Sequence, residues 1–279
     1  MADPQVAPCR VVRVTREGAR PVDDVLVVER ALEIRVDGQA LSVTLRTPGH
    51  DRELTLGFLA AEGVIRARSE VLEIVERPAT CADAPDVAEV TLAPGTRVDW
   101  ARFERHFAST SACGLCGRAH LDSLRAGLVP VDAGFRVRAD ALLDWGGRPR
   151  DSQAAFALTG GLHAAAFAAD AVTPELVRED VGRHNAVDKI VGALLERGDL
   201  PARGGVLWVS GRAGAEIVLK AARAGIPVLA AVGAPSTLAV ELAGAARMTL
   251  IGFLRDGRMN VYTGAERVEL TPAPGQPGR

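Results

Sequence analysis

Residues 205–236, GVLWVSGRAGAEIVLKAARAGIPVLAAVGAPS, carry the clearest structural signal in the chain. The apolar runs at 205–209 and 227–232 predict buried strands, because each is short, mostly aliphatic and followed by a turn. Residues 215–224 between them predict a helix that ends before a glycine. A strand, a helix and a strand joined by such short links imply a right-handed crossover, which makes the two strands parallel.

The same pattern continues toward the C-terminus, where residues 237–243 predict another helix and residues 247–253 a third strand. Both glycine-containing turns then lie at the carboxyl ends of strands, where open α/β sheets bind ligands. Ser210, Arg212 and Ser236 in these turns are candidate contacts for a phosphate or a heterocycle. Neither turn matches a P-loop or a dinucleotide-binding fingerprint, so the turns alone do not identify a nucleotide.

Residues 178–190, REDVGRHNAVDKI, combine many different polar side chains. Apolar residues recur at helical spacing from Val187 onward, so the polar residues are expected in the N-terminal region of a helix. Backbone N–H groups and the helix dipole favour an anion there, and Arg183, His184 and Asn185 add side-chain donors. A solvated, well-capped helix start is the alternative; the variety of polar types favours a binding site.

A further turn, Arg255-Asp256-Gly257-Arg258, leads into a predicted edge strand at residues 259–262. Two arginines at a turn can grip a phosphate. A solvated hairpin tip explains the same pattern equally well.

The first hundred residues predict a small α+β unit, and we expect a domain at residues 1–108, a second domain at 109–270 and a disordered tail at 271–279. Asp51 is a candidate N-cap for a helix that stops near Gly63. The remaining predicted strands lie at residues 10–14, 24–29, 31–36, 40–46, 71–76 and 87–92, further short helices at 100–107 and 139–144, and a helix that leads into a strand at 159–167.

The second predicted domain opens with a pair of thiols in the segment Cys113-Gly114-Leu115-Cys116. The pair lies in a loop that contains glycines and is followed by Arg118. An accessible, locally electropositive loop favours the thiolate form of cysteine. Three functions fit such a pair: half of a zinc site, a dithiol redox couple, or a carrier of persulfide sulfur. The chain has no second CxxC motif, which disfavours a four-cysteine zinc site. The alternative to all three functions is that the two cysteines are small buried side chains with a purely structural role.

Composition narrows the function classes. The net charge of −2 argues against a general nucleic-acid binder, although a local basic pocket remains compatible with it. No apolar run approaches membrane-spanning length, and residues 1–10 lack the apolar segment of a standard signal peptide. We therefore expect a cytoplasmic protein with mostly reduced cysteines and no membrane partner.

These segments, in this order, resemble the FdhD family, the formate dehydrogenase accessory sulfurtransferases. A CxxC motif alone is weak evidence, but the ordered set is specific. The resemblance spans about residues 45–267 and rests on RTPGHD at 46–51, EG at 62–63, CGLCG at 113–117, TGGLH at 159–163, REDVGRHNAVDK at 178–189, SGR at 210–212, APS at 234–236 and NVYTG at 260–264.

The resemblance implies a cytidine-deaminase-like three-layer α/β/α domain with a smaller N-terminal α+β domain, usually as a homodimer. It also implies transfer of persulfide sulfur from a cysteine desulfurase to the molybdenum or tungsten bis(guanine dinucleotide) cofactor, a bound substrate, before the cofactor enters apo-formate dehydrogenase. No permanently bound metal is expected. By the same resemblance Cys113 carries the persulfide, Cys116 is its partner, and Phe253, Leu254, Arg255, Asp256, Gly257 and Arg258 contact the guanine dinucleotide.

Three observations qualify the resemblance. The family more often has serine at the position of Gly233 and a bulkier aromatic residue near Ala215, which bears on the shape of the nucleotide pocket. Ala165 follows His163-Ala164, so the HxE glutamate of zinc-dependent deaminases is absent.

Two rivals belong to other classes. A non-enzymatic chaperone that binds the cofactor needs the arginine-bearing turns and tolerates loss of both cysteines. A dithiol oxidoreductase needs both cysteines and no nucleotide site, and its usual cue is a CxxC that opens a helix after a strand.

Overall fold

The computed structural model describes residues 5–81, 83–100, 103, 128–131, 134–145, 152–170 and 173–270. The segment that carries Cys113 and Cys116, most of the helix expected at 100–107, and the tail from residue 271 lie outside the described residues.

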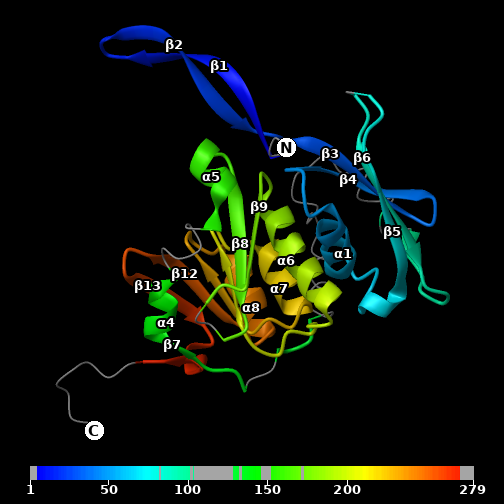
Figure 1. The fold of residues 1–279 in the computed structure, drawn as a ribbon. Coiled ribbons are helices and arrows are strands. Elements are labelled where there is room, and N and C mark those ends of the chain that lie inside the picture. The colour runs from blue at the N-terminus through cyan, green and yellow to red at the C-terminus, as the bar shows by residue number, and fades with distance from the viewer. Residues whose placement is uncertain are drawn as a thin grey trace.

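A six-stranded sheet forms the centre of the larger part of the molecule (Figure 1). Its strand order is β13-β12-β11-β10-β8-β9. The strands β10, β11 and β12 run parallel, as expected, whereas β8 is antiparallel to β10, β9 to β8 and β13 to β12. The strands are β8 (His163–Ala168), β9 (Leu176–Asp180), β10 (Val206–Val209), β11 (Val228–Ala231), β12 (Thr249–Arg255) and β13 (Arg258–Thr263).

Helices cover both faces of this sheet because its central strands are buried on both sides. One face, which includes Leu207 and Val209 of β10, packs on α6, α7 and α8. The other, which includes Val206 and Trp208, packs on α4 and the short strand β7. The finer cytidine-deaminase-like arrangement stays a prediction. The elements are α4 (Ala139–Asp144), α5 (Ala154–Thr159), α6 (Arg183–Arg197), α7 (Ala215–Arg223), α8 (Thr237–Ala245), the 3₁₀ turn η3 (Ala265–Arg267), and the paired short strands β7 (Val137–Arg138) and β14 (Val268–Glu269).

The N-terminal part contains a four-stranded sheet, of order β4-β3-β6-β5, with helix α1 packed against its apolar face. Fully buried residues alternate with partly buried ones along β3, and the alternation brings Leu32, Ile34 and Val36 into the core. The elements are β3 (Arg30–Val36), β4 (Gln39–Arg46), α1 (Asp51–Ala61), the 3₁₀ turn η1 (Arg68–Glu70), β5 (Val71–Arg77) and β6 (Asp86–Leu92).

Two glycines let α1 and α6 cross in close contact. A Cβ atom added to Gly57 would stand 1.8 Å from the carbonyl oxygen of Asp188. A Cβ atom added to Gly192 would stand 1.8 Å from the carbonyl oxygen of Glu53. Each helix therefore presents a bare backbone to the other, and this crossing joins the N-terminal part to the central sheet.

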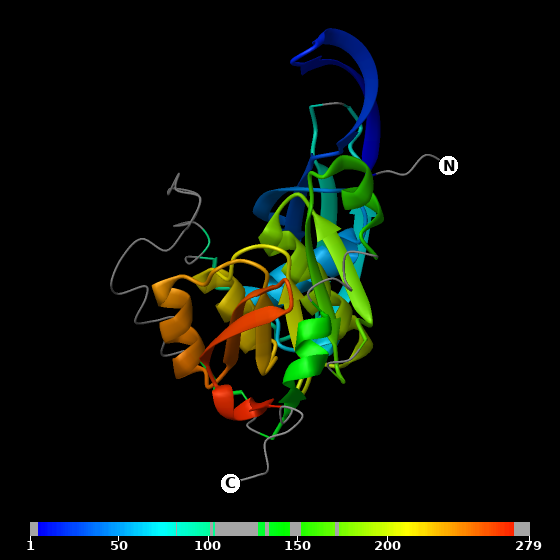
Figure 2. The ribbon, with the colours of Figure 1, turned by 90° about the vertical axis from the view of Figure 1, so that its left-hand side faces the viewer.

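The first two strands form a separate antiparallel hairpin, β1 (Val6–Thr15) and β2 (Gly18–Val27), which projects away from the rest of the chain (Figures 1 and 2). The strand expected at residues 10–14 falls within β1, and the strand expected at 24–29 overlaps β2, which begins earlier and ends at Val27. Only its base approaches α5.

Two sequence-based expectations were wrong. Residues 176–180 form the strand β9, although their charges suggested the approach to a helix. The first helix has His50, in a left-handed backbone conformation, as its N-cap; Asp51 is the first helical residue, and its carboxylate binds Arg46. In both cases, partners distant in sequence determine the local structure.

Candidate functional site

The three predicted turns at the carboxyl ends of β10, β11 and β12 lie side by side. The amide of Gly233 donates to the Gly211 carbonyl oxygen at 2.9 Å, and the amide of Phe253 donates to the Gly233 carbonyl oxygen at 3.1 Å. Ser236 N–H also donates to the Ala213 carbonyl oxygen at 3.2 Å. Main-chain hydrogen bonds thus join the turns into one continuous rim, which we call the carboxyl rim (residues 210–214, 233–236 and 253–258).

Close packing at Gly233 fixes the middle of the carboxyl rim. A Cβ atom there would meet the Gly211 carbonyl oxygen at 3.0 Å and the Arg212 Cα and Cγ atoms at 3.1 Å. A larger residue would require the Gly211 carbonyl or Arg212 to move by a few tenths of an ångström. Gly214 is different, since a Cβ atom on it would meet nothing within 4 Å.

The last turn of the rim carries a strained aromatic residue. Phe253 has a φ of 55°, a conformation that costs a non-glycine residue free energy and therefore requires support from its surroundings. Its hydrogen bond to Gly233 gives that support. The Arg255 guanidinium lies over the Phe253 ring, 5.8 Å from its centroid, while Arg258 is exposed.

The two serines of the rim have roles within the fold. The Ser210 hydroxyl accepts a hydrogen bond from Ala164 N–H at 2.9 Å, which ties the rim to β8. Ser236 caps α8 by accepting from Ala239 N–H at 3.2 Å. Arg212 is exposed, and its side chain makes no hydrogen bond or ion pair with any described residue. It is therefore available to a ligand.

The N-terminus of α6 adds a second group of polar side chains beside the rim. Arg183 is exposed, and His184 Nε2 lies 2.9 Å from Glu216 Oε2 on α7. His163 at the start of β8 faces Gly211, and its Nδ1 is 3.5 Å from where a Cβ on that glycine would stand. Burial lowers the pKa of His163, and the positive charges of Arg183 and His184 lower it further. Imidazole and guanidinium donors thus surround this end of the sheet.

Asn185 turns inward, away from that group. Its Nδ2 donates to the Leu45 carbonyl oxygen at 2.8 Å and to Asp180 Oδ1 at 3.0 Å, while Thr44 Oγ1 donates to its Oδ1 at 3.3 Å. Within the described structure, Asn185 joins β4 to the start of α6. Its assignment as a nucleotide contact stays a prediction.

A buried ion pair explains much of the polar character of residues 178–189. Lys189 Nζ lies 2.8 Å from Asp180 Oδ2, and both side chains are fully buried. Lys189 also donates to the carbonyl oxygens of Thr47 and Glu179, at 3.0 and 3.1 Å. Asp180 accepts from Thr47 N–H at 3.2 Å and from Gly182 N–H at 2.8 Å. Nearly all of their hydrogen-bonding capacity is used inside the molecule.

Two neighbours in the same run also have structural partners. Arg178 forms a bidentate pair with Glu53, at 2.5 and 2.7 Å. Burial raises the pKa of Glu53, but hydrogen bonds and charge from Arg178 and His50 outweigh it and lower the pKa to about 2. The Glu179 carboxylate accepts from the amides of Ala155 and Phe156, which begins α5. These partners lie far apart in the sequence, so no local pattern indicates them.

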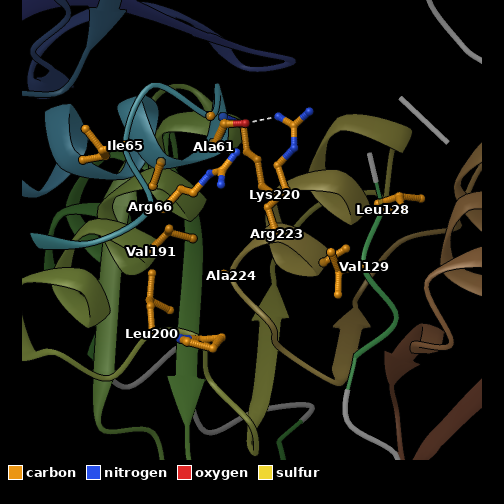
Figure 3. Close-up of a pocket in the computed structure, with 14 residues that line it drawn as sticks. Ala61, Ile65, Arg66, Leu128, Val129, Val191, Leu200, Lys220, Arg223 and Ala224 are labelled. Carbon is orange, nitrogen blue, oxygen red and sulfur yellow. Dashed lines mark hydrogen bonds between the residues drawn. The ribbon is translucent and has the colours of Figure 1, made fainter. Parts of the chain in front are cut away.

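A pocket of about 600 Å³ lies apart from the carboxyl rim, between the C-terminal ends of α1 and α7 (Figure 3). Arg66, Lys220 and Arg223 line it among aliphatic side chains. Lys220 is held by Asp188 at 2.7 Å, and Arg223 donates to the Ala61 carbonyl oxygen. None of the predicted site residues that the structure describes lines this pocket.

The described residues thus bring Arg183, His184, Ser210, Arg212, Ser236 and the turn 253–258 to one end of the sheet. Cys113 and Cys116 lie outside the described residues, so their distance from the rim is not part of this geometry. No helix among the described residues is long and apolar enough to span a membrane.

Comparison with known proteins gives consistent matches. Residues 27–269 match the model of the FdhD/NarQ family. A sulfur carrier protein FdhD from Streptomyces coelicolor is 49% identical over 280 residues, covering 96% of this chain and 97% of the relative. A sulfur carrier protein FdhD from Mycobacterium tuberculosis is 48% identical over 253 residues, covering 88% and 92%.

A solved structure also matches. The crystal structure of a candidate formate dehydrogenase accessory protein from Desulfotalea psychrophila superimposes with a TM-score of 0.75 at 22% identity. The match covers 95% of this chain and all of the other. At this identity it supports the mixed α/β fold.

Proposed function

Because the chain belongs to the FdhD/NarQ family, we propose that it is a sulfurtransferase required for formate dehydrogenase activity. It takes persulfide sulfur from a cysteine desulfurase and passes it to the molybdenum or tungsten bis(guanine dinucleotide) cofactor, before that cofactor enters apo-formate dehydrogenase. The relatives named as sulfur carriers support the sulfur half of this proposal. We further propose a cytoplasmic homodimer with a cytidine-deaminase-like domain, in keeping with the 2-1-3-4-5 order of β8 to β12.

The sulfur chemistry is a pair of exchange steps. The Cys113 thiolate attacks the outer sulfur of the donor persulfide; the new S–S bond forms as the old one breaks, and the donor leaves as a thiolate. Cys116 thiolate then attacks Cys113 Sγ, which forms an internal disulfide and releases hydrosulfide with its electron pair. A dithiol reductant restores the two thiols. The first step involves no net oxidation or reduction. In the second step the two cysteines lose two electrons to the transferred sulfur as they form the disulfide. The dithiol reductant then returns two electrons to that disulfide.

The carboxyl rim is the observation that carries the nucleotide half of the proposal. Arg212 and Arg258 are exposed on the two outer turns of the rim, with the turn of Gly233 between them. Arg183 is exposed near Gly211, and Arg255 is stacked on Phe253. Guanidinium groups bind phosphates with bidentate geometry, and an aromatic ring offers a surface for a base. This end of the parallel strands is also where α/β sheets bind ligands. A guanine dinucleotide presents both phosphates and bases.

The sulfur half is tested by loading the full chain with a cysteine desulfurase and L-cysteine and recording intact mass with and without reductant. We expect one reducible sulfur adduct, which disappears in Cys113→Ala. Cys81→Ala is the matched control, because Cys81 is exposed and free yet lies outside the motif. An adduct that persists in Cys113→Ala, with the donor shown to be competent, would overturn the relay.

The nucleotide half is tested by calorimetry with GDP as the probe. Arg212→Gln removes an exposed guanidinium from the rim, so we expect the dissociation constant for GDP to rise at least tenfold, about 1.4 kcal/mol. Gly214→Ala, which adds a methyl group to open space on the same rim, is expected to bind as the parent does. Equal affinities for both variants would place the nucleotide elsewhere.

The chaperone is the alternative function, since the exposed arginines of the rim serve cofactor binding without any sulfur step. The two functions differ in one outcome. Cys113→Ala abolishes activation of formate dehydrogenase if the sulfur relay operates, and leaves activation intact if cofactor binding suffices.

A further inference from the structure

The pocket between the C-terminal ends of α1 and α7 has walls of only two kinds. Its volume of about 600 Å³ lies within the range of small-molecule sites in proteins. Three of its lining residues are cationic, and the rest are aliphatic residues, alanines and a glycine. Among the described residues, no aromatic, acidic or neutral hydrogen-bonding side chain lines it. These two kinds of wall restrict the chemistry of a ligand.

The cations gather on one side of the pocket (Figure 3). Lys220 and Arg223 belong to the last turn of α7, and Arg66 lies in the loop that follows α1. Arg66 is exposed, and its side chain makes no hydrogen bond or ion pair with any described residue. Its guanidinium is therefore available to a ligand.

The three cations do not offer equal charge to the pocket. Lys220 Nζ lies 2.7 and 2.8 Å from the two carboxylate oxygens of the buried Asp188, so this charge is neutralised within the fold. Arg223 donates to the Ala61 carbonyl oxygen, which holds it at the end of α1. Each helix C-terminus carries about half a negative charge, and two helices end here, which offsets about one of the two remaining cations. The pocket therefore matches a monoanion better than a dianion.

The rest of the wall is aliphatic and comes from separate parts of the chain. Ile65 and Val191 are almost fully buried, whereas Val129 is 76% exposed and leaves apolar surface open to water. A ligand that covers this surface gains free energy from its burial. A heterocycle would find no ring to stack on and no side-chain acceptor for its N–H groups. The aliphatic residues are Ile65, Leu128, Val129, Val191, Leu200 and Pro201.

The pocket and the carboxyl rim lie at opposite ends of α7. The helix begins at Ala215, directly after Gly214 of the rim, and ends at Arg223 in the pocket wall. Nine helical residues at 1.5 Å each span about 13 Å. A small ligand in the pocket therefore leaves the rim open.

We propose that this pocket is a second ligand site, which binds an aliphatic monocarboxylate such as a medium-chain fatty acid. The carboxylate pairs with the Arg66 guanidinium, beside Arg223, because a guanidinium binds a carboxylate through two parallel hydrogen bonds. The acyl chain lies against the aliphatic wall. This ligand differs in chemistry from a guanine dinucleotide, and the proposal depends on neither sulfur transfer nor nucleotide binding.

The first test is calorimetric titration of the full chain with butanoate, hexanoate and octanoate. Burial of one methylene group is expected to tighten binding about fourfold, so each added pair should tighten it up to about fifteenfold. Octanol has the same chain without the charge and is expected to bind at least tenfold more weakly than octanoate, which should bind one molecule per chain. Absence of octanoate binding, no dependence on chain length, or octanol that binds as tightly as octanoate overturns the proposal.

Substitutions locate the ligand in the pocket. Arg66→Gln is expected to weaken octanoate binding at least tenfold, whereas Arg77→Gln, an exposed arginine on β5 outside the pocket, is the matched control and should bind as the parent does. Val129→Glu and Val129→Lys change one exposed lining residue to opposite charges. The glutamate should repel the carboxylate and weaken binding at least tenfold, and the lysine should keep or raise the affinity. Equal affinity in all four variants overturns the proposal.

Competition with GDP distinguishes the pocket from the carboxyl rim. Octanoate should bind with the same dissociation constant in the presence and absence of excess GDP, because the two sites lie at opposite ends of α7. Displacement of octanoate by GDP overturns the assignment to the pocket. The titrations without GDP keep their meaning if the nucleotide site or the sulfur relay fails its own test.

Discussion

Replacing Gly57 by alanine tests the close crossing of α1 and α6. The added Cβ would stand 1.8 Å from the Asp188 carbonyl oxygen, whereas ordinary contacts begin at 3.4 Å, so the helices must separate by roughly 1.6 Å (3.4 − 1.8). Overpacking of this kind costs about 1–3 kcal/mol, and a clash with backbone belongs at the upper end because backbone cannot rotate away. The higher helix propensity of alanine returns about 1 kcal/mol. The net destabilisation should be about 2 kcal/mol.

Thermal unfolding followed by circular dichroism measures this effect. For a chain of this size, about 2 kcal/mol lowers the midpoint by roughly 4–8 °C. Gly244→Ala in α8 is the matched control, since its Cβ would meet only Thr263 Cγ2 at 3.9 Å. The control should keep or raise the midpoint. If Gly57→Ala unfolds at the parent temperature, the crossing is looser than the structure indicates and the reasoning fails.

Two further tests probe the ionic network. Asp180→Asn leaves the fully buried Lys189 ammonium without its counter-charge and should lower the free energy of unfolding in urea by about 3–5 kcal/mol. The double variant Asp180→Asn with Lys189→Met should recover much of that loss. Equal stability of the single and double variants would contradict this account of the ion pair. Arg178→Gln removes the partner that, against burial, lowers the pKa of Glu53 to about 2. The lowered pKa of Glu53 stabilises the folded parent fully above pH 4.5, and this stabilisation is lost as the pH falls toward 2. The variant lacks the stabilisation at every pH. The difference in urea midpoint between parent and variant should therefore become smaller from pH 7 to pH 3. Arg52→Gln, which removes a half-exposed pair with Glu196, is the control and should show no such change with pH.

The parallel strands and helices after residue 205 were predictable because their signals are local. Strand β10 is buried along its whole length, and α7 is amphipathic and ends before a glycine. The meeting of the three turns at one end of the sheet follows from that connectivity alone. Local pattern and tertiary structure agree here, and so the mixed α/β class and the meeting of the turns at one sheet end could be stated in advance.

The strand β9 could not be recognised because its polar residues find partners far away in sequence. Arg178 pairs with Glu53, and Asp180 pairs with Lys189 and the backbone of Thr47. From the sequence alone, these charged side chains are expected to be hydrated at the surface. In the folded chain each of them is instead paired with an opposite charge or a backbone polar group. Asn185 was interpreted as a ligand contact for the same reason, although its amide bonds within the fold.

The same network gives the candidate site its rigidity. Asp180 accepts from the backbone of Gly182 and the side chain of Asn185, and Lys189 donates to two main-chain carbonyl oxygens, those of residues 47 and 179. The first turn of α6 is therefore held from within, which leaves Arg183 and His184 on its outer side. An anion site built on a helix that is already fixed does not have to order that helix when the ligand binds, so less of the binding free energy is lost. The buried charges of residues 178–189 position the exposed ones, and a change in either should be measurable at the carboxyl rim.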